Sequence, residues 1–173
     1  MPGELQKGQG CYPHACQCGF YGDSLRECTC TSNQIHRYRQ RLSGPLRDRF
    51  DLQIEVPRLE FSELAPSVGE TSAQVKARVQ RARDIQRERF EGMGLASNAA
   101  MSHKHLEVFC VLSRASQDML GAAYKHLGLS TRAHDRILRV ARTIADLEGS
   151  ESISQEHLAE AIQYRSLDRK IYG

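Results

Sequence analysis

The stretch 128-GLSTRAHDRILRVARTIADLEG-149 decides how this chain folds, because its apolar residues recur every three or four positions. That spacing places them on one face of an α-helix and leaves most of the arginines and acids on the other faces. Ser130 is a favourable helix N-cap and Gly149 a favourable helix end, so the sequence predicts a helix between them. The apolar positions are Ala133, Ile137, Val140, Ala141, Ile144 and Leu147.

The same periodicity continues on both sides of this helix and predicts a helical bundle. Four or five helices joined by short loops pack as a compact bundle around their apolar faces. The predicted helices begin near Thr71 or Ser72, Ser102, Ser113, Ser130 and Ser154. The first of them presents Val75, Val79, Ala82, Ile85 and Phe90 on one side and ends at Gly92-Met93-Gly94.

The first part of the chain has a different pattern. Residues 1–33 are rich in glycine and cysteine and read as irregular, and Ser32 is placed to begin and cap a short helix. Residues 52–56 alternate apolar and polar side chains before Pro57, which predicts one short strand. The fold class is therefore mainly α. The predicted parts are a Cys-rich segment with that strand (1–58), a linker (59–70) and a helical domain (71–173).

Composition and charge exclude several classes of protein. The 173 residues, 40% hydrophobic and 26% charged, are ordinary for a globular chain. No apolar run approaches the roughly 20 residues of a membrane span, and the polar N-terminus lacks the apolar core of a secretory signal. We therefore expect no membrane partner and a cytoplasmic location.

A net charge of +3 is too small to indicate by itself that the chain binds nucleic acid. Acids interleave the arginine-rich stretches 37–58 and 78–89, which favours solvated helix faces over a phosphate-binding strip.

Five of the six cysteines fall within residues 11–30. In a reducing compartment, clustered thiols indicate metal or redox chemistry rather than structural disulfides. Two Cys-x-Cys pairs could bring four thiolates around one ion, and tetrahedral sulfur coordination suits Zn²⁺. The predicted ligands are Cys16, Cys18, Cys28 and Cys30. His14 or His36 could replace a thiol that faces away, and free cysteines remain the alternative.

Four motifs of the chain resemble one known family. They are 16-CQCGFYGD-23, 28-CTCT-31, 43-SGPLRDRFDL-52 and the stretch 128–149 quoted above. Together with the helix start 69-GETS-72, they resemble the Mg-chelatase-like AAA+ ATPases over most of the chain. The resemblance implies that the first part is the end of an AAA+ α/β core and that the helical domain is an AAA+ lid.

The resemblance also implies roles for individual arginines. Arg49 matches the arginine finger that reaches the nucleotide of a neighbouring subunit, where a planar charged guanidinium can neutralise a transferring phosphoryl group. Arg132 matches the sensor-2 arginine, at a helix N-terminus whose dipole also favours anions. If the alignment of this helix with the family is shifted, Arg136 or Arg139, one or two turns further along the helix, takes the sensor-2 role. The alternative for each of these arginines is a structural role, on a helix surface or in a salt bridge, without contact to a nucleotide.

The implied cofactors are ATP and Mg²⁺, and the implied partners are the remaining AAA+ core or like subunits in a ring. DNA is one candidate substrate of the family's ATP-driven remodelling. The sequence nevertheless contains no Gly-x-x-x-x-Gly-Lys-Ser/Thr loop and no apolar strand ending in an acidic pair for Mg²⁺. His14 stands where the family has Asn, and Arg47 where relatives usually have Leu.

Because phosphate positioning supplies most of the rate of phosphoryl transfer, we expect no ATP turnover by this chain alone. The leading hypothesis is therefore the C-terminal part of such an ATPase, contributing arginines to a site completed elsewhere. The rivals are a non-enzymatic, zinc-stabilised helical adaptor and a nucleic-acid-binding module that uses the arginines of residues 37–49.

Overall fold

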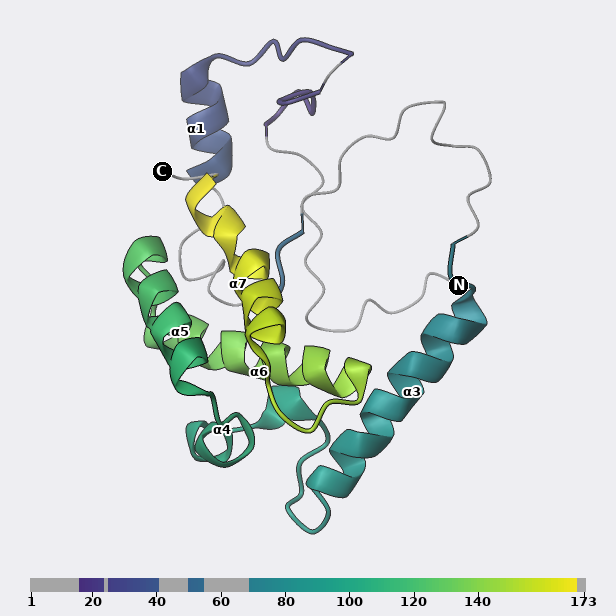
Figure 1. The fold of residues 1–173 in the computed structure, drawn as a ribbon. Helices are drawn as coiled ribbons and strands as arrows, with labels where there is room; N and C mark the ends of the chain where they lie inside the picture. The colour runs from purple at the N-terminus through teal and green to yellow at the C-terminus, as the bar shows by residue number, and fades with distance from the viewer. Residues whose placement is uncertain (1–15, 24, 41–49, 55–68, 171–173) are drawn as a thin grey trace. The chain divides into compact units, whose positions relative to one another are not determined.

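The computed structural model describes residues 16–23, 25–40, 50–54 and 69–170 (Figure 1). The chain divides into two compact units, residues 1–58 with 167–173, and residues 59–166. In the described residues the regular elements are six α-helices and one short 3-10 helix, and no strand is present. None of the described helices is long and apolar enough to cross a bilayer. The mainly helical prediction is confirmed for this part of the chain.

Helix α6 (Thr131–Glu148) is the central element of the larger unit. The Ser130 hydroxyl caps its start by accepting a hydrogen bond from the Ala133 N–H at 3.1 Å. Gly149 ends it in the left-handed conformation, with φ at 75°. The helix predicted from the stretch 128–149 is therefore confirmed at both ends, and α3, α4 and the 3-10 helix contact it.

The other predicted helices of this unit are also confirmed, and their apolar faces meet in one core. They are α3 (Ser72–Arg89), α4 (His103–Phe109), α5 (Arg114–Leu127) and α7 (Gln155–Lys170), with the 3-10 helix η2 (Asn98–Ala100) between α3 and α4. The largest apolar side chains of the core are Phe90, Met101, Leu106, Leu120, Leu129, Ile137, Leu138, Ile144, Ile153 and Leu158.

A buried network of charged and polar side chains joins α3 and η2 to α6. The Asp146 carboxylate, 1% exposed, accepts two hydrogen bonds from Arg89 and one from the Asn98 amide at 2.7 Å. It also accepts one from Arg142 Nε at 3.1 Å. The remaining Arg142 donors reach the carbonyl oxygens of Ser150 and Glu151 after the helix. Two guanidinium groups thus share one buried carboxylate in a low-dielectric setting, where unpaired charge is costly.

The apolar side predicted for α3 is buried only in its second half. Ala82 and Phe90 lie in the interior, but Val75 is 37% exposed and Val79 is 44% exposed. Of residues 71–81, all but Arg78 are exposed. Helical spacing therefore identified the correct face, but it does not show how far along the helix a neighbour covers that face.

The strand predicted over residues 52–56 is wrong for the part that the structure describes. Residues 52–54 have no regular structure, and Leu52 and Ile54 are 49% and 66% exposed. Residues 55 and 56 lie outside the described residues. A strand needs a neighbouring strand for its backbone hydrogen bonds, and none occurs among the residues described. The predicted boundaries of the linker at 59–70 stay a prediction, because residues 59–68 are not described.

In the smaller unit, α1 spans Ser32–Gln40. The helix starts at the predicted residue, but Thr31 rather than Ser32 occupies the N-cap position. The Gln34 side chain accepts a hydrogen bond from the Thr31 N–H at 2.8 Å, and the Thr31 hydroxyl accepts one from the Gln34 N–H at 3.3 Å. These reciprocal bonds form a capping box, which fixes the direction in which the chain enters α1.

Candidate functional site

Two tight turns bring the first Cys-x-Cys pair back toward the second. The Gly19 N–H donates to the Cys16 carbonyl at 3.3 Å, and the Asp23 N–H donates to the Phe20 carbonyl at 3.1 Å. Gly19 and Gly22 have φ of 87° and 80°, a region that side chains with a Cβ rarely adopt. The Asp23 carboxylate then accepts the N–H groups of residues 25 and 26 at 2.8 and 3.0 Å, which directs the chain toward Cys28.

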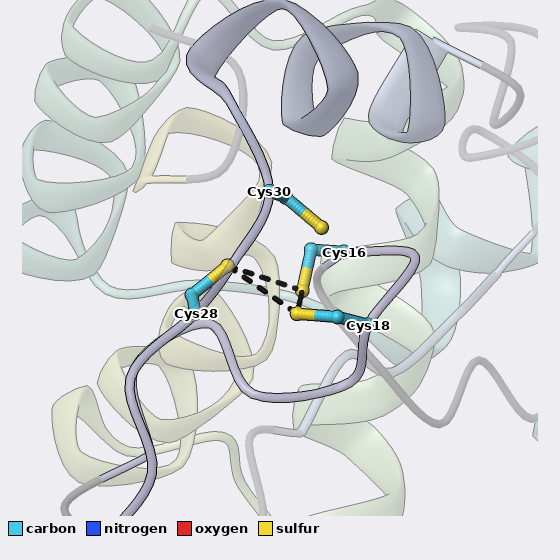
Figure 2. A group of neighbouring side chains, drawn as sticks. All are labelled: Cys16, Cys18, Cys28 and Cys30. Atoms are coloured by element: carbon cyan, nitrogen blue, oxygen red, sulfur yellow. Dashed lines mark hydrogen bonds between the residues drawn. The ribbon is translucent and has the colours of Figure 1, made fainter.

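The four thiols converge on one point, as Figure 2 shows. The sulfur atoms of Cys16 and Cys18 are 3.3 Å apart, those of Cys18 and Cys28 are 3.5 Å apart, and those of Cys16 and Cys28 are 3.7 Å apart. All four sulfurs, including that of Cys30, lie within 4.8 Å of one another. These separations far exceed the roughly 2.05 Å of a disulfide bond. The group is a cluster of free thiols of a size that could hold one zinc ion.

Backbone amides also act on the ionisation of these thiols. The amides of Phe20, Cys30 and Cys18 act to lower the pKa of Cys18, Cys28 and Cys30 respectively. A hydrogen bond from a backbone N–H stabilises a thiolate more than a neutral thiol, because the thiolate is the stronger acceptor. Three of the four sulfurs therefore sit where the backbone favours a negative charge.

The ionisation of the cluster is uneven. The Phe20 N–H, assisted by the neighbouring thiols, lowers the pKa of Cys18 to about 5. The pKa of Cys28 is raised to about 12: the Cys30 N–H opposes the rise, but desolvation and hydrogen bonds to the other thiols outweigh it. Without a cation, Cys28 and Cys30 keep their protons beside the Cys18 thiolate, because like charges repel at these distances. A divalent cation at the centre would reverse that preference, since it attracts all four thiolates.

The sequence analysis kept His14 and His36 as substitutes for a thiol that faces away. No such substitute is needed, because all four predicted cysteines point toward one another. His36 is exposed on α1, and His14 lies outside the described residues. The fifth cysteine of the segment, Cys11, also lies outside them.

The predicted arginines differ in how the protein already uses them. Arg132 is exposed in the first turn of α6 and makes no hydrogen bond or ion pair within the described part of the chain. Arg136 is half-buried and is engaged in an interaction within the protein. Arg139 donates two hydrogen bonds to the Met101 carbonyl, at 3.0 and 2.8 Å. The predicted finger, Arg49, lies outside the described residues, so its place in a site with Arg132 stays a prediction.

Around Asp135, near the start of α6, the structure adds two histidines that the sequence analysis did not single out. His103, at the start of α4, and His134, in the first turns of α6, place Nδ1 atoms 3.1 and 3.3 Å from the same Asp135 oxygen. The only sequence signal was that His134 and Asp135 lie within the stretch 128–149; nothing marked His103 as their neighbour. Both histidines border a groove of about 610 Å³ between α4, α5 and α6.

Sequence comparisons match the chain to two family descriptions in succession. Residues 13–64 match "Magnesium chelatase, subunit ChlI", and residues 69–165 match "Magnesium chelatase, subunit ChlI C-terminal". The second match alone covers more than half of the chain. The first contains the four clustered cysteines and Arg49, and the second contains Arg132.

Individual relatives are similar over most of this chain. It is 49% identical over 138 residues to "Competence protein ComM" of Haemophilus influenzae, covering 79% of this chain and 26% of that protein. It is 44% identical over 142 residues to "Uncharacterized protein YifB" of Escherichia coli, covering 81% of this chain and 27% of that protein. An uncharacterized protein of Mycobacterium bovis is 34% identical over 165 residues, covering 91% of this chain and 33% of that protein. The chain thus spans about a quarter to a third of the length of these relatives.

Proposed function

This chain belongs to the family of magnesium chelatase subunit ChlI, whose C-terminal region it carries, and we propose that its arginines complete an ATP site in an AAA+ assembly. In this proposal Arg49 is the arginine finger and Arg132 is the sensor-2 residue. Bound MgATP supplies the phosphoryl group to be transferred. The protein's contribution is to neutralise the charge that develops on that group.

The observation that carries the proposal is the contrast among the arginines of α6. The guanidinium groups of Arg139 and Arg142 are held by carbonyl or carboxylate oxygens, whereas that of Arg132 is exposed and uncommitted within the described residues. Arg132 also lies in the first turn of the helix, where free backbone N–H groups and the helix dipole attract anions. A side chain in this position can reach a phosphate without breaking an existing contact.

The same contrast ranks the substitutes. Moving Arg139 to a phosphate would leave the Met101 carbonyl without its two donors, which costs about 1–3 kcal/mol for a buried acceptor. Arg136 would likewise have to break an existing interaction within the protein before it could bind a phosphate. Arg132 is therefore our choice for the sensor-2 role, and Arg136 the second choice.

The groups that bind the phosphates and Mg²⁺ would come from polypeptide outside this sequence. The sequence contains neither a phosphate-binding loop nor an acidic pair for Mg²⁺. We propose that an AAA+ core, from the same or a neighbouring subunit of a ring, provides both. ATP-driven remodelling in such a ring, with DNA as a candidate substrate, is the role proposed for the assembly.

A second candidate function is a non-enzymatic adaptor, and the thiol cluster is the observation that favours it. In that case the metal-stabilised segment and the helical bundle would bind a partner protein, and Arg132 would have no role in ATP hydrolysis. The two functions predict different results when Arg132 is replaced.

The experiment that tests the proposal uses a chimera, in which residues 13–165 replace the matching region of the Haemophilus influenzae relative. This chain alone should neither bind ATP tightly nor hydrolyse it, whereas the chimera should hydrolyse it. In the chimera, Arg49→Ala should lower kcat by about 10³-fold or more, as for other arginine fingers. Arg132→Ala should lower it by about 10²-fold, as when one transition-state donor is lost.

Arg83→Ala is the matched control, because Arg83 is exposed on α3 and makes no hydrogen bond or ion pair with the residues that the structure describes. Its kcat should equal that of the unmodified chimera. Turnover by this chain alone, or an Arg132→Ala chimera as active as the control, would contradict the proposal.

A further inference from the structure

The smaller unit has almost no apolar interior among its described residues. Of residues 16–23, 25–38 and 50–54, Cys16 alone is buried, and Tyr21, Leu25, Leu52 and Ile54 are exposed. These described residues therefore contribute little hydrophobic stabilisation to set against the conformational entropy lost on folding. The thiol cluster joins the first of the two turns to the residues directly before α1.

The dimensions of the thiol cluster match a single tetrahedral ion. Zinc–sulfur bonds of about 2.3 Å in a tetrahedron place neighbouring sulfurs about 3.8 Å apart. The three measured separations run from 3.3 to 3.7 Å, and no pair of the four exceeds 4.8 Å. An iron–sulfur cluster would hold some of its cysteine sulfurs farther apart, because its inorganic core lies between them. The cage therefore fits one metal ion.

The donor set selects the metal. Four thiolates in a tetrahedron suit zinc or a single iron, and zinc binds such a site more tightly than ferrous iron. With all four positions filled by protein ligands, no position is left for water or substrate, which is the pattern of a structural rather than a catalytic site.

We propose that Cys16, Cys18, Cys28 and Cys30 bind one Zn²⁺ ion as a closed structural site that folds residues 16–40. Binding replaces the protons still on the thiols, so each thiol that loses a proton gains a Zn–S bond and no oxidant or reductant is involved. The last ligand, Cys30, is followed directly by Thr31, the N-cap of α1. The ion therefore fixes the start of α1 and, through the capping box, the direction of that helix.

The main test is the metal content of the full chain, purified without added metal and measured by elemental analysis. We expect close to one zinc per chain, whereas less than about 0.2 zinc per chain, or iron in place of zinc, would overturn the proposal. Cys18→Ser and Cys28→Ser should each lose most of the zinc. Cys110→Ala is the matched control and should keep it, because Cys110 lies in the larger unit and outside the cluster.

Two further measurements keep the test decisive if a cysteine variant folds poorly. First, replacing zinc by Co²⁺ in the unmodified chain should give the intense visible absorption of a tetrahedral thiolate complex; a weak octahedral spectrum would contradict the four-thiolate site.

Second, a strong chelator should make residues 16–40 sensitive to protease while residues 72–165 stay resistant, because the larger unit has its own core. Equal resistance with and without chelator would contradict the structural role of the metal. Neither result depends on ATP hydrolysis.

Discussion

Arg89 and Asp146 are 57 residues apart in the sequence, yet the Arg89 guanidinium donates two hydrogen bonds to the Asp146 carboxylate. Both partners are largely shielded, with side chains 14% and 0% exposed. The pair joins the end of α3 to the last turn of α6, and Arg142 binds the same carboxylate from one turn earlier in α6. This contact links α3 to α6 and involves none of the predicted site residues.

Replacing Asp146 by Ala should therefore destabilise the larger unit by about 3–5 kcal/mol, because two guanidinium groups would be left without their counter-charge. The measurement is the free energy of unfolding from a urea titration followed by circular dichroism. Asp84→Ala is the matched control, since its partner Arg87 is on the surface and the side chains of Arg87 and Asp84 are 68% and 47% exposed. The control should change stability by less than about 1 kcal/mol. Equal effects of the two substitutions would show that the buried pair has no special role.

Arg132 and Arg139 allow function and stability to be separated on one helix. Arg132→Ala should leave the unfolding free energy within about 0.5 kcal/mol of the unmodified chain, because it removes an exposed side chain that has no partner among the described residues. Arg139→Ala should lower it by about 1–3 kcal/mol, because the Met101 carbonyl loses both of its donors. Thermal unfolding of the two variants checks the order. A larger loss for Arg132→Ala would mean that this arginine has a structural role.

Two glycines, one inside α5 and one at its end, should respond in opposite directions to alanine. Gly128 ends the helix at φ 61°, where a Cβ is strained, so Gly128→Ala should destabilise by about 1 kcal/mol. Gly121 lies inside the same helix and faces open space, so Gly121→Ala should stabilise by about 0.5–1 kcal/mol. Neither added methyl group meets an atom within 4 Å, so backbone preference alone decides the sign. Urea titration of both variants tests this, and a shift of the same sign in both would contradict it.

The Cys110 thiol should be unreactive toward alkylating reagents in the folded chain. It is 4% exposed, and burial raises the pKa of its thiol to about 11. At pH 8 only about one such thiol in a thousand is ionised, and the thiolate is the reactive form. Iodoacetamide followed by peptide mass mapping should therefore find Cys110 unmodified in the native chain and modified after unfolding in urea. Rapid labelling of the native chain would show that α4 opens readily.

The same thiol should make stability depend on pH in the alkaline range. Because its folded pKa of about 11 lies above the ordinary value of 9.0, the neutral form is favoured in the folded state. This contribution is complete below about pH 9 and is lost as the pH rises toward about 11, since the unfolded chain ionises first. The difference in unfolding free energy between the unmodified chain and Cys110→Ala should shrink over that interval. A difference that stays constant would contradict the assignment.

Local sequence signals accounted for most of the secondary structure. Helices α3 to α6 each begin beside a residue whose side chain can cap them and end near a glycine or a break in the apolar pattern, as with Ser130 and Gly149 around α6. These signals act over four or five residues, so they can be recognised without knowing the rest of the fold. The four cysteines were found in the same way, because paired thiols at short spacing are rare outside metal sites.

The amino-acid sequence was thus sufficient to predict the helices, most of their caps, the family and the thiols that form the cluster. The three-dimensional fold was needed to learn which arginines are committed: Arg139 and Arg142 are bound inside the protein, whereas Arg132 has no partner among the described residues. It was also needed to show that Val79 stays exposed and that residues 52–54 form no strand. The difference arises because capping and helical periodicity are properties of neighbouring residues. Burial, ion pairing and strand pairing instead require a partner from a distant part of the chain, and its presence cannot be read from local sequence.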